Sequence, residues 1–182
     1  MKIVAIGLIA LTLIVSSATL VSPVNAASLP GGASSLNESH GDWSLTCNTR
    51  GQGDAATVQC SVTQNLLDQS SKRRVLTIAL SPQQGGGVKG VVIMPFGVAL
   101  DQGATFQLDA GAATAPSHYR TCVPAGCIVP VDWPDATVKA MRSASMLKIG
   151  AVMDNGKATP FSITMNGFAS AIDRAVALIG MK

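Results

Sequence analysis

A pair of closely spaced cysteines constrains the fold of this 182-residue chain more than any other feature. Cys122 and Cys127 enclose only Val, Pro, Ala and Gly, so a disulfide between them closes a ring that requires a tight turn. Proline and glycine favour such a turn, and extended apolar segments lie on both sides of the ring. The sequence therefore predicts a chain reversal between two strands, locked by a disulfide, in a protein that matures in an oxidising compartment.

The other two cysteines, Cys47 and Cys60, flank a polar loop that contains Gly51 and Gly53. Four cysteines allow three pairings, and pairing between neighbours is the simplest of them. On the chain-entropy model, closure of the longer loop stabilises the fold by roughly 3 kcal/mol, more than closure of the short ring. We therefore predict the disulfides Cys47–Cys60 and Cys122–Cys127, the first of them within a hairpin of two strands.

The first 26 residues differ in composition from the rest of the chain. Lys2 precedes an almost uninterrupted apolar stretch over residues 3–20, and small residues precede Ala27. This arrangement predicts a signal peptide over residues 1–26. An uncleaved membrane anchor is the rival interpretation, since the stretch approaches the ~20 residues that cross a bilayer. Residues 22–26 favour cleavage because they resemble a signal-peptidase region and not a basic stop-transfer flank.

The remainder of the chain is long enough for one domain with a sizeable core. Residues 27–40 are rich in small residues and lack an apolar period, which predicts a flexible arm and places a single domain over residues 41–182. The formal net charge of +3 and the 13% of charged residues do not indicate nucleic-acid binding. A sequence pI near 8.8 is compatible with loose association with anionic lipids or polysaccharides.

Short segments of alternating apolar and polar residues recur at the spacing of a β-sandwich. Trp43, Leu45 and Cys47 fall on one face of such a segment, which predicts a strand with a buried side. Residues 75–80 are apolar on both faces, as in a central strand. Further strands are predicted over residues 58–62, 91–94, 96–100, 104–109, 146–153 and 159–165, with a hairpin turn at residues 154–156.

Two helices complete the predicted fold. A short helix starts after Trp133, with Pro134 in its first turn and Asp135 at its positive end. From Asn166, a good N-cap residue, apolar residues recur at helical spacing to Ile179, which predicts an amphipathic helix packed on the sheet. A membrane-surface helix is disfavoured because the polar face lacks basic residues. The predicted fold is therefore mainly β, a β-sandwich of short antiparallel strands with one short helix, a C-terminal amphipathic helix and two disulfides.

Five short blocks follow one another along residues 41–178. They are Trp43 with Cys47, Cys60 followed by Gln64, the Met-Pro-Phe-Gly-Val-Ala-Leu block at residues 94–100, Cys122 with Gly126 and Cys127, and Gly167 with Phe168 at the last helix. Their order resembles the invasion-associated locus B family of exported bacterial proteins, which more often has Leu where this chain has Met94. The resemblance implies a periplasmic, outer-membrane-associated or secreted protein of a Gram-negative bacterium, linked to host-cell entry or colonisation, without catalytic residues.

No catalytic, metal or cofactor site is indicated by the sequence. Four residues separate Cys122 from Cys127, whereas a thioredoxin motif has two at the start of a helix. His40 and His118 are the only histidines, and zinc binding beside the cysteines would require reduced thiols. The methionines are dispersed, and the glycines at residues 85–87 lead into a strand, so neither copper nor nucleotide binding is favoured. We expect a non-enzymatic binding or adhesion module, with a periplasmic enzyme or thiol-redox protein as the alternative.

Lys72, Arg73 and Arg74 form the only run of three like charges in the sequence. Such a run at the start of a strand is explained by solvation and by protection against edge-to-edge pairing. The functional interpretation is an anion-contact patch, because adjacent Lys and Arg combine point-charge and forked donors for phosphates or acidic glycans. The expected partner is an envelope or host-cell component, such as lipopolysaccharide or a host-surface glycan.

Export predicts a defined new N-terminus. Protein made in a Gram-negative host is expected to begin at Ala27 or Ser28, because Val24 and Ala26 satisfy the small-residue requirement of signal peptidase. N-terminal sequencing of the purified protein measures this directly. Recovery of an intact Met1 on membrane-bound material would show that the segment is an anchor.

Overall fold

The computed structural model describes residues 29–180, and the predicted signal peptide lies outside this range. Ten strands and two α-helices make up the described chain, with two short 3-10 turns at Pro30–Gly32 and Gly53–Ala55. The strands are β1 (Ser35–His40), β2 (Trp43–Arg50), β3 (Thr57–Leu67), β4 (Arg74–Pro82), β5 (Val88–Met94), β6 (Ala104–Leu108), β7 (Thr121–Val123), β8 (Gly126–Trp133), β9 (Met146–Val152) and β10 (Ala158–Thr164). The helices are α1 (Asp135–Ser143) and α2 (Phe168–Ile179).

Seven strands form one antiparallel sheet in the order β1-β2-β3-β4-β5-β8-β7. β4 lies at its centre between β3 and β5, which confirms the central strand predicted over residues 75–80. Leu76, Ile78 and Leu80 of β4 are buried in the core. The remaining strands form a second antiparallel sheet in the order β10-β9-β6. The predicted fold of antiparallel strands with two helices and two disulfides is confirmed.

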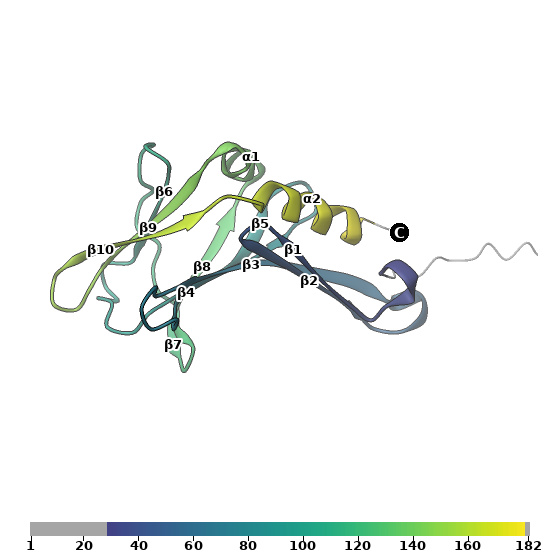
Figure 1. Cartoon of the computed structure of the whole chain (residues 1–182), viewed down its shortest axis with the longest axis horizontal. Coiled ribbons are helices and arrows are strands. Elements are labelled where there is room, and N and C mark those ends of the chain that lie inside the picture. The colour runs from purple at the N-terminus through teal and green to yellow at the C-terminus, as the bar shows by residue number, and fades with distance from the viewer. Residues whose placement is uncertain (1–28, 181–182) are drawn as a thin grey trace, which may run out of the picture.

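Two different elements cover one face of the large sheet, as Figure 1 shows. α2 packs over β2 and β3, where the rings of Trp43 and Phe168 have centroids 5.0 Å apart. The smaller sheet covers the other end, where Phe106 of β6 and Trp133 of β8 meet edge to face with centroids 5.2 Å apart. These aromatic contacts belong to one continuous cluster of buried apolar side chains.

One backbone carbonyl joins the large sheet to the start of α2. The indole Nε1 of Trp43 donates a hydrogen bond of 3.0 Å to the carbonyl oxygen of Thr164, the last residue of β10. The side-chain amide of the buried Gln64 on β3 donates to the same oxygen at 3.1 Å. Both polar groups are thereby satisfied inside the core, and the point where the chain leaves the smaller sheet is attached to β2 and β3.

The two disulfides join directly opposed residues of antiparallel strands. Cys47 and Cys60 are register partners on β2 and β3, on the inner face predicted for the hairpin. Cys122 and Cys127 are register partners on β7 and β8, across the tight turn that the short spacing requires. Both pairings agree with the neighbour pairing predicted from the sequence.

The N-terminal segment is more ordered than the sequence analysis predicts. Residues 35–40, expected within a flexible arm over residues 27–40, form β1 and pair with β2 along its whole length. Leu29 is buried in the core as well. The apolar period is too short to reveal such a strand, because β1 is an edge strand held by backbone hydrogen bonds to its neighbour. The arm prediction is therefore wrong for this part of the chain.

Residues 96–100 do not form the predicted strand. Pro95 ends β5, a turn follows, and Val98 makes only an isolated bridge to Met153. The start of the C-terminal helix also differs from the prediction, because the N-cap of α2 is Gly167 and not Asn166. The side chain of Asn166 donates instead to Asp42 at 3.2 Å.

No helix within residues 29–180 has the length and apolar character needed to cross a membrane.

Docking of α2 through its first residue predicts a large loss of stability for Phe168→Ala. Phe168 is fully buried against Trp43, so truncation removes an aromatic contact and leaves a cavity. We expect the free energy of unfolding to fall by about 3–5 kcal/mol, measured by denaturant unfolding of the oxidised protein. Val176→Ala on the half-exposed side of the same helix is the control and is expected to change little. An unchanged stability of Phe168→Ala would show that the helix does not dock.

Candidate anion-binding surface

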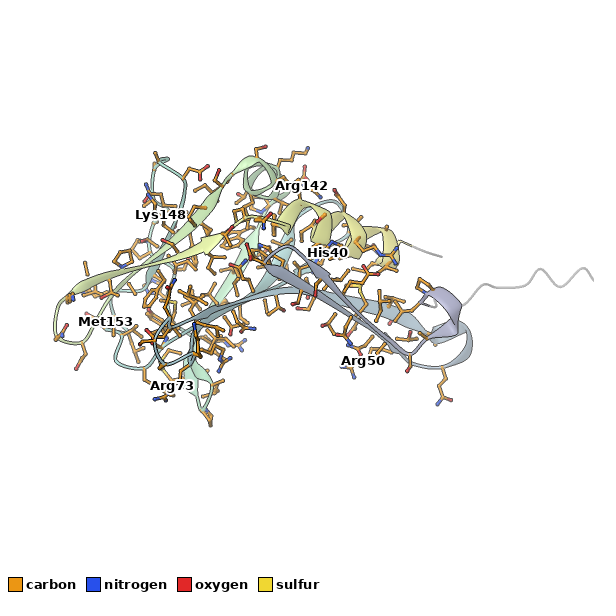
Figure 2. The ribbon with its side chains drawn as sticks, in the orientation of Figure 1. His40, Arg50, Arg73, Arg142, Lys148 and Met153 are labelled. Carbon is orange, nitrogen blue, oxygen red and sulfur yellow. A yellow bond between two sulfur atoms is a disulfide. The ribbon has the colours of Figure 1, made fainter. Side chains whose placement is uncertain are left out.

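Three chain segments meet at one end of the large sheet. Because its strands are antiparallel, β4 begins where β5 ends and where β8 begins, and Ile93 pairs with both Thr77 and Ile128. The β3–β4 loop, the segment after β5 and the β7–β8 turn are therefore neighbours. We call this end, formed by residues 67–74, 95–96 and 123–126, the cationic tip. Figure 2 shows Arg73 on the side of the molecule where β7 projects.

A carboxylate organises the β3–β4 loop. Asp68 accepts hydrogen bonds from the backbone N–H of Ser71 at 2.8 Å and from the hydroxyls of Ser70 and Ser71 at 2.7 and 2.8 Å. These donors, the Ser71 backbone first, lower the pKa of Asp68 to about 2. The backbone N–H of Asp68 also donates to the carbonyl of Arg73, and Lys72 adopts a left-handed conformation with φ of 56°. The loop is a closed turn that presents its basic residues outward.

Lys72, Arg73 and Arg74 are all exposed at this tip. Within residues 29–180, none of the three forms a salt bridge to a carboxylate. Arg74 donates to the hydroxyl of Thr77 and to the carbonyl of Ala125, each at 3.1 Å, so its guanidinium also holds the β7–β8 turn. The side chains of Lys72 and Arg73 have no protein acceptor in the described chain.

A pocket of about 330 Å³ opens beside the arginines. Its volume falls at the lower end of the range for small-molecule sites. Its lining combines two arginines with apolar and proline residues, and Phe96 among them is 60% exposed. The lining residues are Arg73, Arg74, Val75, Ile93, Pro95, Phe96, Pro124, Ala125 and Gly126. Forked N–H donors beside an apolar wall suit a phosphate or carboxylate with an apolar body attached.

Sequence reasoning missed the second half of this pocket. The sequence analysis predicts a strand from Phe96 onward, and it interprets the β7–β8 turn only through its disulfide. Gly126 has φ of 132°, and a Cβ on this residue would collide with the carbonyl oxygen of Met94, so only glycine allows the turn to approach β5 closely. The sequence signal for this half of the pocket was Phe96, an aromatic residue directly after the proline that ends a strand. Strand pairing does not hold such a residue in the core.

A second polar cluster joins β1 to α2. His40 lies 3.2 Å from Glu38 through Nε2 and 3.2 Å from the hydroxyl of Ser170 through Nδ1, which places Ser, His and Glu in line. Arg174, however, binds both carboxylate oxygens of Glu38 at 2.9–3.1 Å, and Ser170 donates its proton to the carbonyl of Gly167. The hydrogen bonds from Arg174, followed by those from His40, hold the pKa of Glu38 below its usual value. The arrangement fits a structural link between strand and helix.

The residues considered for metals and redox chemistry are dispersed or already bonded. His118 is exposed, and no three His, Cys, Asp or Glu residues of the described chain lie close enough together to hold a metal ion. All four cysteines are in disulfides. Cys122 and Cys127 lie on paired strands, whereas a thioredoxin-type thiol lies at the start of a helix. Met94, Met141 and Met165 are buried in the core as ordinary filling.

Comparison with known proteins gives consistent matches. Residues 43–176 match the family model described as Invasion associated locus B (IalB) protein. An Invasion protein B homolog of Brucella abortus (strain 2308) is 36% identical over 154 residues, 84% of this chain and 86% of that protein. Invasion protein B of Bartonella bacilliformis is 31% identical over 187 residues, 97% of this chain and 98% of that protein. The crystal structure of invasion associated protein b from Bartonella henselae has a TM-score of 0.69 at 29% identity, covering 79% and 96% of the two chains.

The fold and the surface define a mainly β domain with two disulfides, a C-terminal helix packed on the large sheet, and a cationic pocket at one end. The chain belongs to the invasion-associated locus B family. The blocks that carry the resemblance have structural roles in this fold. Trp43 and Gln64 bind the carbonyl of Thr164, and Gly167 permits close contact between the start of α2 and the carbonyl of His40.

The hydrogen bonds around Asp68 predict a pH response of the loop. Because the pKa of Asp68 is lowered from 3.8 to about 2, its contribution to loop order is complete above pH 3.8 and is lost as the pH falls through about 2. In NMR titrations, the amide shift of Ser71 is expected to change near pH 2 in the parent and not to titrate in Asp68→Ala. Asp101→Ala, which removes an exposed carboxylate from another loop, is the control. A Ser71 transition near pH 4 in the parent would contradict the geometry.

Proposed function

We propose that this chain is an exported, non-enzymatic binding protein of the bacterial envelope that contacts an anionic partner through the cationic tip. The observation that carries the proposal is the exposed run of Lys72, Arg73 and Arg74, without carboxylate partners in the described chain, at a pocket lined by both arginines and the exposed Phe96. Charges that serve only solubility are usually interspersed with the opposite sign. A single-sign cluster beside a pocket instead attracts and orients anionic groups.

Export is supported by two features of the chain. The N-terminal segment has the charge and apolar pattern of a signal peptide, and both disulfides require an oxidising compartment. The periplasm, the outer membrane surface or the exterior therefore suits the mature protein. The relatives named invasion protein B support a contribution to host-cell entry or colonisation, which we extend to this chain as part of the proposal.

A periplasmic enzyme or thiol-redox protein is less well supported. Each disulfide joins two cysteines on paired antiparallel strands, and Cys47 and Cys60 are also buried. The cluster of Ser170, His40 and Glu38 is not arranged as a catalytic triad. Arg174 binds the carboxylate of Glu38, and the hydroxyl of Ser170 donates to the backbone carbonyl of Gly167. A binding role requires neither a free thiol nor an activated nucleophile, and it uses the surface that the fold exposes.

Replacement of Lys72, Arg73 and Arg74 by Ser tests the proposal. Lys72 and Arg73 are exposed and make no side-chain hydrogen bond in the described chain, so their replacement is expected to change the unfolding free energy only slightly. Arg74→Ser also removes the hydrogen bonds to Thr77 and Ala125, so we expect the triple variant to lose about 1–3 kcal/mol of unfolding free energy and to remain folded. Binding to envelope fractions and host cells at low salt is expected to fall at least tenfold in a pull-down titration. Binding by the parent is expected to weaken as salt rises, because the screening length is about 8 Å at physiological ionic strength.

The matched control removes the same formal charge elsewhere. Arg50→Ser, Lys89→Ser and Lys148→Ser take three cations from positions away from the cationic tip. Lys89 lies near the start of β5, whereas the tip lies at the end of this strand, and Figure 2 shows Arg50 and Lys148 well separated from Arg73. This variant is expected to bind like the parent. Equal binding by the parent and the tip variant would show that the cluster only solvates a strand end. Equal losses in both variants would assign the effect to net charge and not to a site.

A further inference from the structure

Apolar side chains gather around the cationic tip. Leu67, Phe96 and Val123 are 49%, 60% and 36% exposed, and they are three of the five large exposed apolar residues in residues 29–180. Leu67 pairs with Arg74 across the β3–β4 ladder, and Val123 pairs with Gly126 at the β7–β8 turn. The chain therefore exposes apolar and basic side chains together on three adjacent loops.

A small soluble anion would explain the basic side chains of the cationic tip but not the exposed apolar ones. It would neutralise the guanidinium groups but would leave Leu67, Phe96 and Val123 in water. An anionic bilayer offers both complements, because phosphates form its outer layer and acyl carbons lie directly beneath. Amphipathic and aromatic side chains prefer this boundary, where one end is apolar and the other is wet.

We propose that the cationic tip binds the surface of an anionic phospholipid bilayer, with a lipid phosphate in the pocket and Phe96 inserted among the acyl chains. The proposal rests on the proposed function, since it names the chemistry of the anionic partner. Phosphate oxygens match the forked N–H donors of Arg73, which has no side-chain hydrogen bond within the described chain. Arg74, which lines the same pocket, uses two donors on Thr77 and Ala125 and retains its other N–H donors.

The position of the tip suits contact with a flat surface. The β7–β8 hairpin projects from the body of the molecule in Figure 1, away from α2. The disulfide Cys122–Cys127 closes this hairpin, and the hydrogen bond from Arg74 to Ala125 holds it against the start of β4. A preformed tip loses little conformational entropy on binding, so a few side chains are sufficient for reversible attachment.

Vesicle binding tests the inference. The protein is purified from the periplasm of an expression host with both disulfides formed, and it is sedimented with vesicles of phosphatidylcholine alone or mixed with phosphatidylglycerol. The parent is expected to bind the mixed vesicles and not phosphatidylcholine. Each basic side chain is expected to contribute about fivefold to the affinity, and high salt is expected to remove most of it.

Phe96→Ser is expected to weaken binding to the mixed vesicles by about tenfold or more, because insertion of the ring is lost. The control is Val176→Ser, which removes an apolar side chain of similar exposure (48%) from α2 and is expected to bind like the parent. Phe96→Trp supplies a second readout, which reports the environment of the ring at position 96. Its fluorescence is expected to shift to the blue with mixed vesicles and to be quenched by brominated acyl chains.

The outcomes separate this inference from the proposed function. Equal binding of the parent to both vesicle types would overturn the lipid proposal, even where the Lys72, Arg73 and Arg74 variant still loses binding to envelope fractions or host cells. Complete competition by glycerol phosphate, with Phe96→Ser equal to the parent, would identify a soluble-anion pocket and overturn insertion. A protein partner captured from the envelope by the parent, together with an unshifted Phe96→Trp spectrum on vesicles, would also overturn the inference.

Discussion

The shared carbonyl of Thr164 is the contact on which the arrangement of the molecule depends. Trp43 from β2 and Gln64 from β3 donate to it, so two strands of the large sheet are attached to the end of the smaller one. An unpaired buried polar group costs about 1–3 kcal/mol, and displacement of this segment would leave both donors unpaired. The attachment sets where α2 begins, and the ring of Phe168 then closes over Trp43.

The cationic tip, at one end of the same sheet, is a consequence of the strand order. β8 is inserted between β5 and β7, so the turn that carries Ala125 comes to lie beside the start of β4. Gly126 allows the backbones to approach, and Arg74 reaches the turn through its hydrogen bond to the carbonyl of Ala125. The disulfide Cys122–Cys127 therefore does more than close a turn, because it shapes one wall of a pocket whose other wall comes from a distant part of the sequence.

Local features of the fold were predictable because their information lies within a few residues. The alternation at Trp43 and Leu45, the spacing of the cysteines and the hairpin at residues 154–156 each depend on neighbours in sequence, and all of them are present. β1 was missed because pairing with β2 supplies its order. Asn166 was assigned as an N-cap on propensity, whereas Gly167 occupies that position because α2 starts against the backbone of His40.

The sequence by itself determined the strand-rich composition, the disulfide pairs, the closing helix and the run of three basic residues. Only the tertiary structure decided that Arg73 and Arg74 line one pocket together with Phe96 and Pro124. The physical reason is that the pairing of distant strands depends on the packing of the whole core. The segments that line the pocket are therefore brought together by contacts between strands, and no single segment encodes those contacts. The sequence shows the charges, and the sheet order determines what they lie beside.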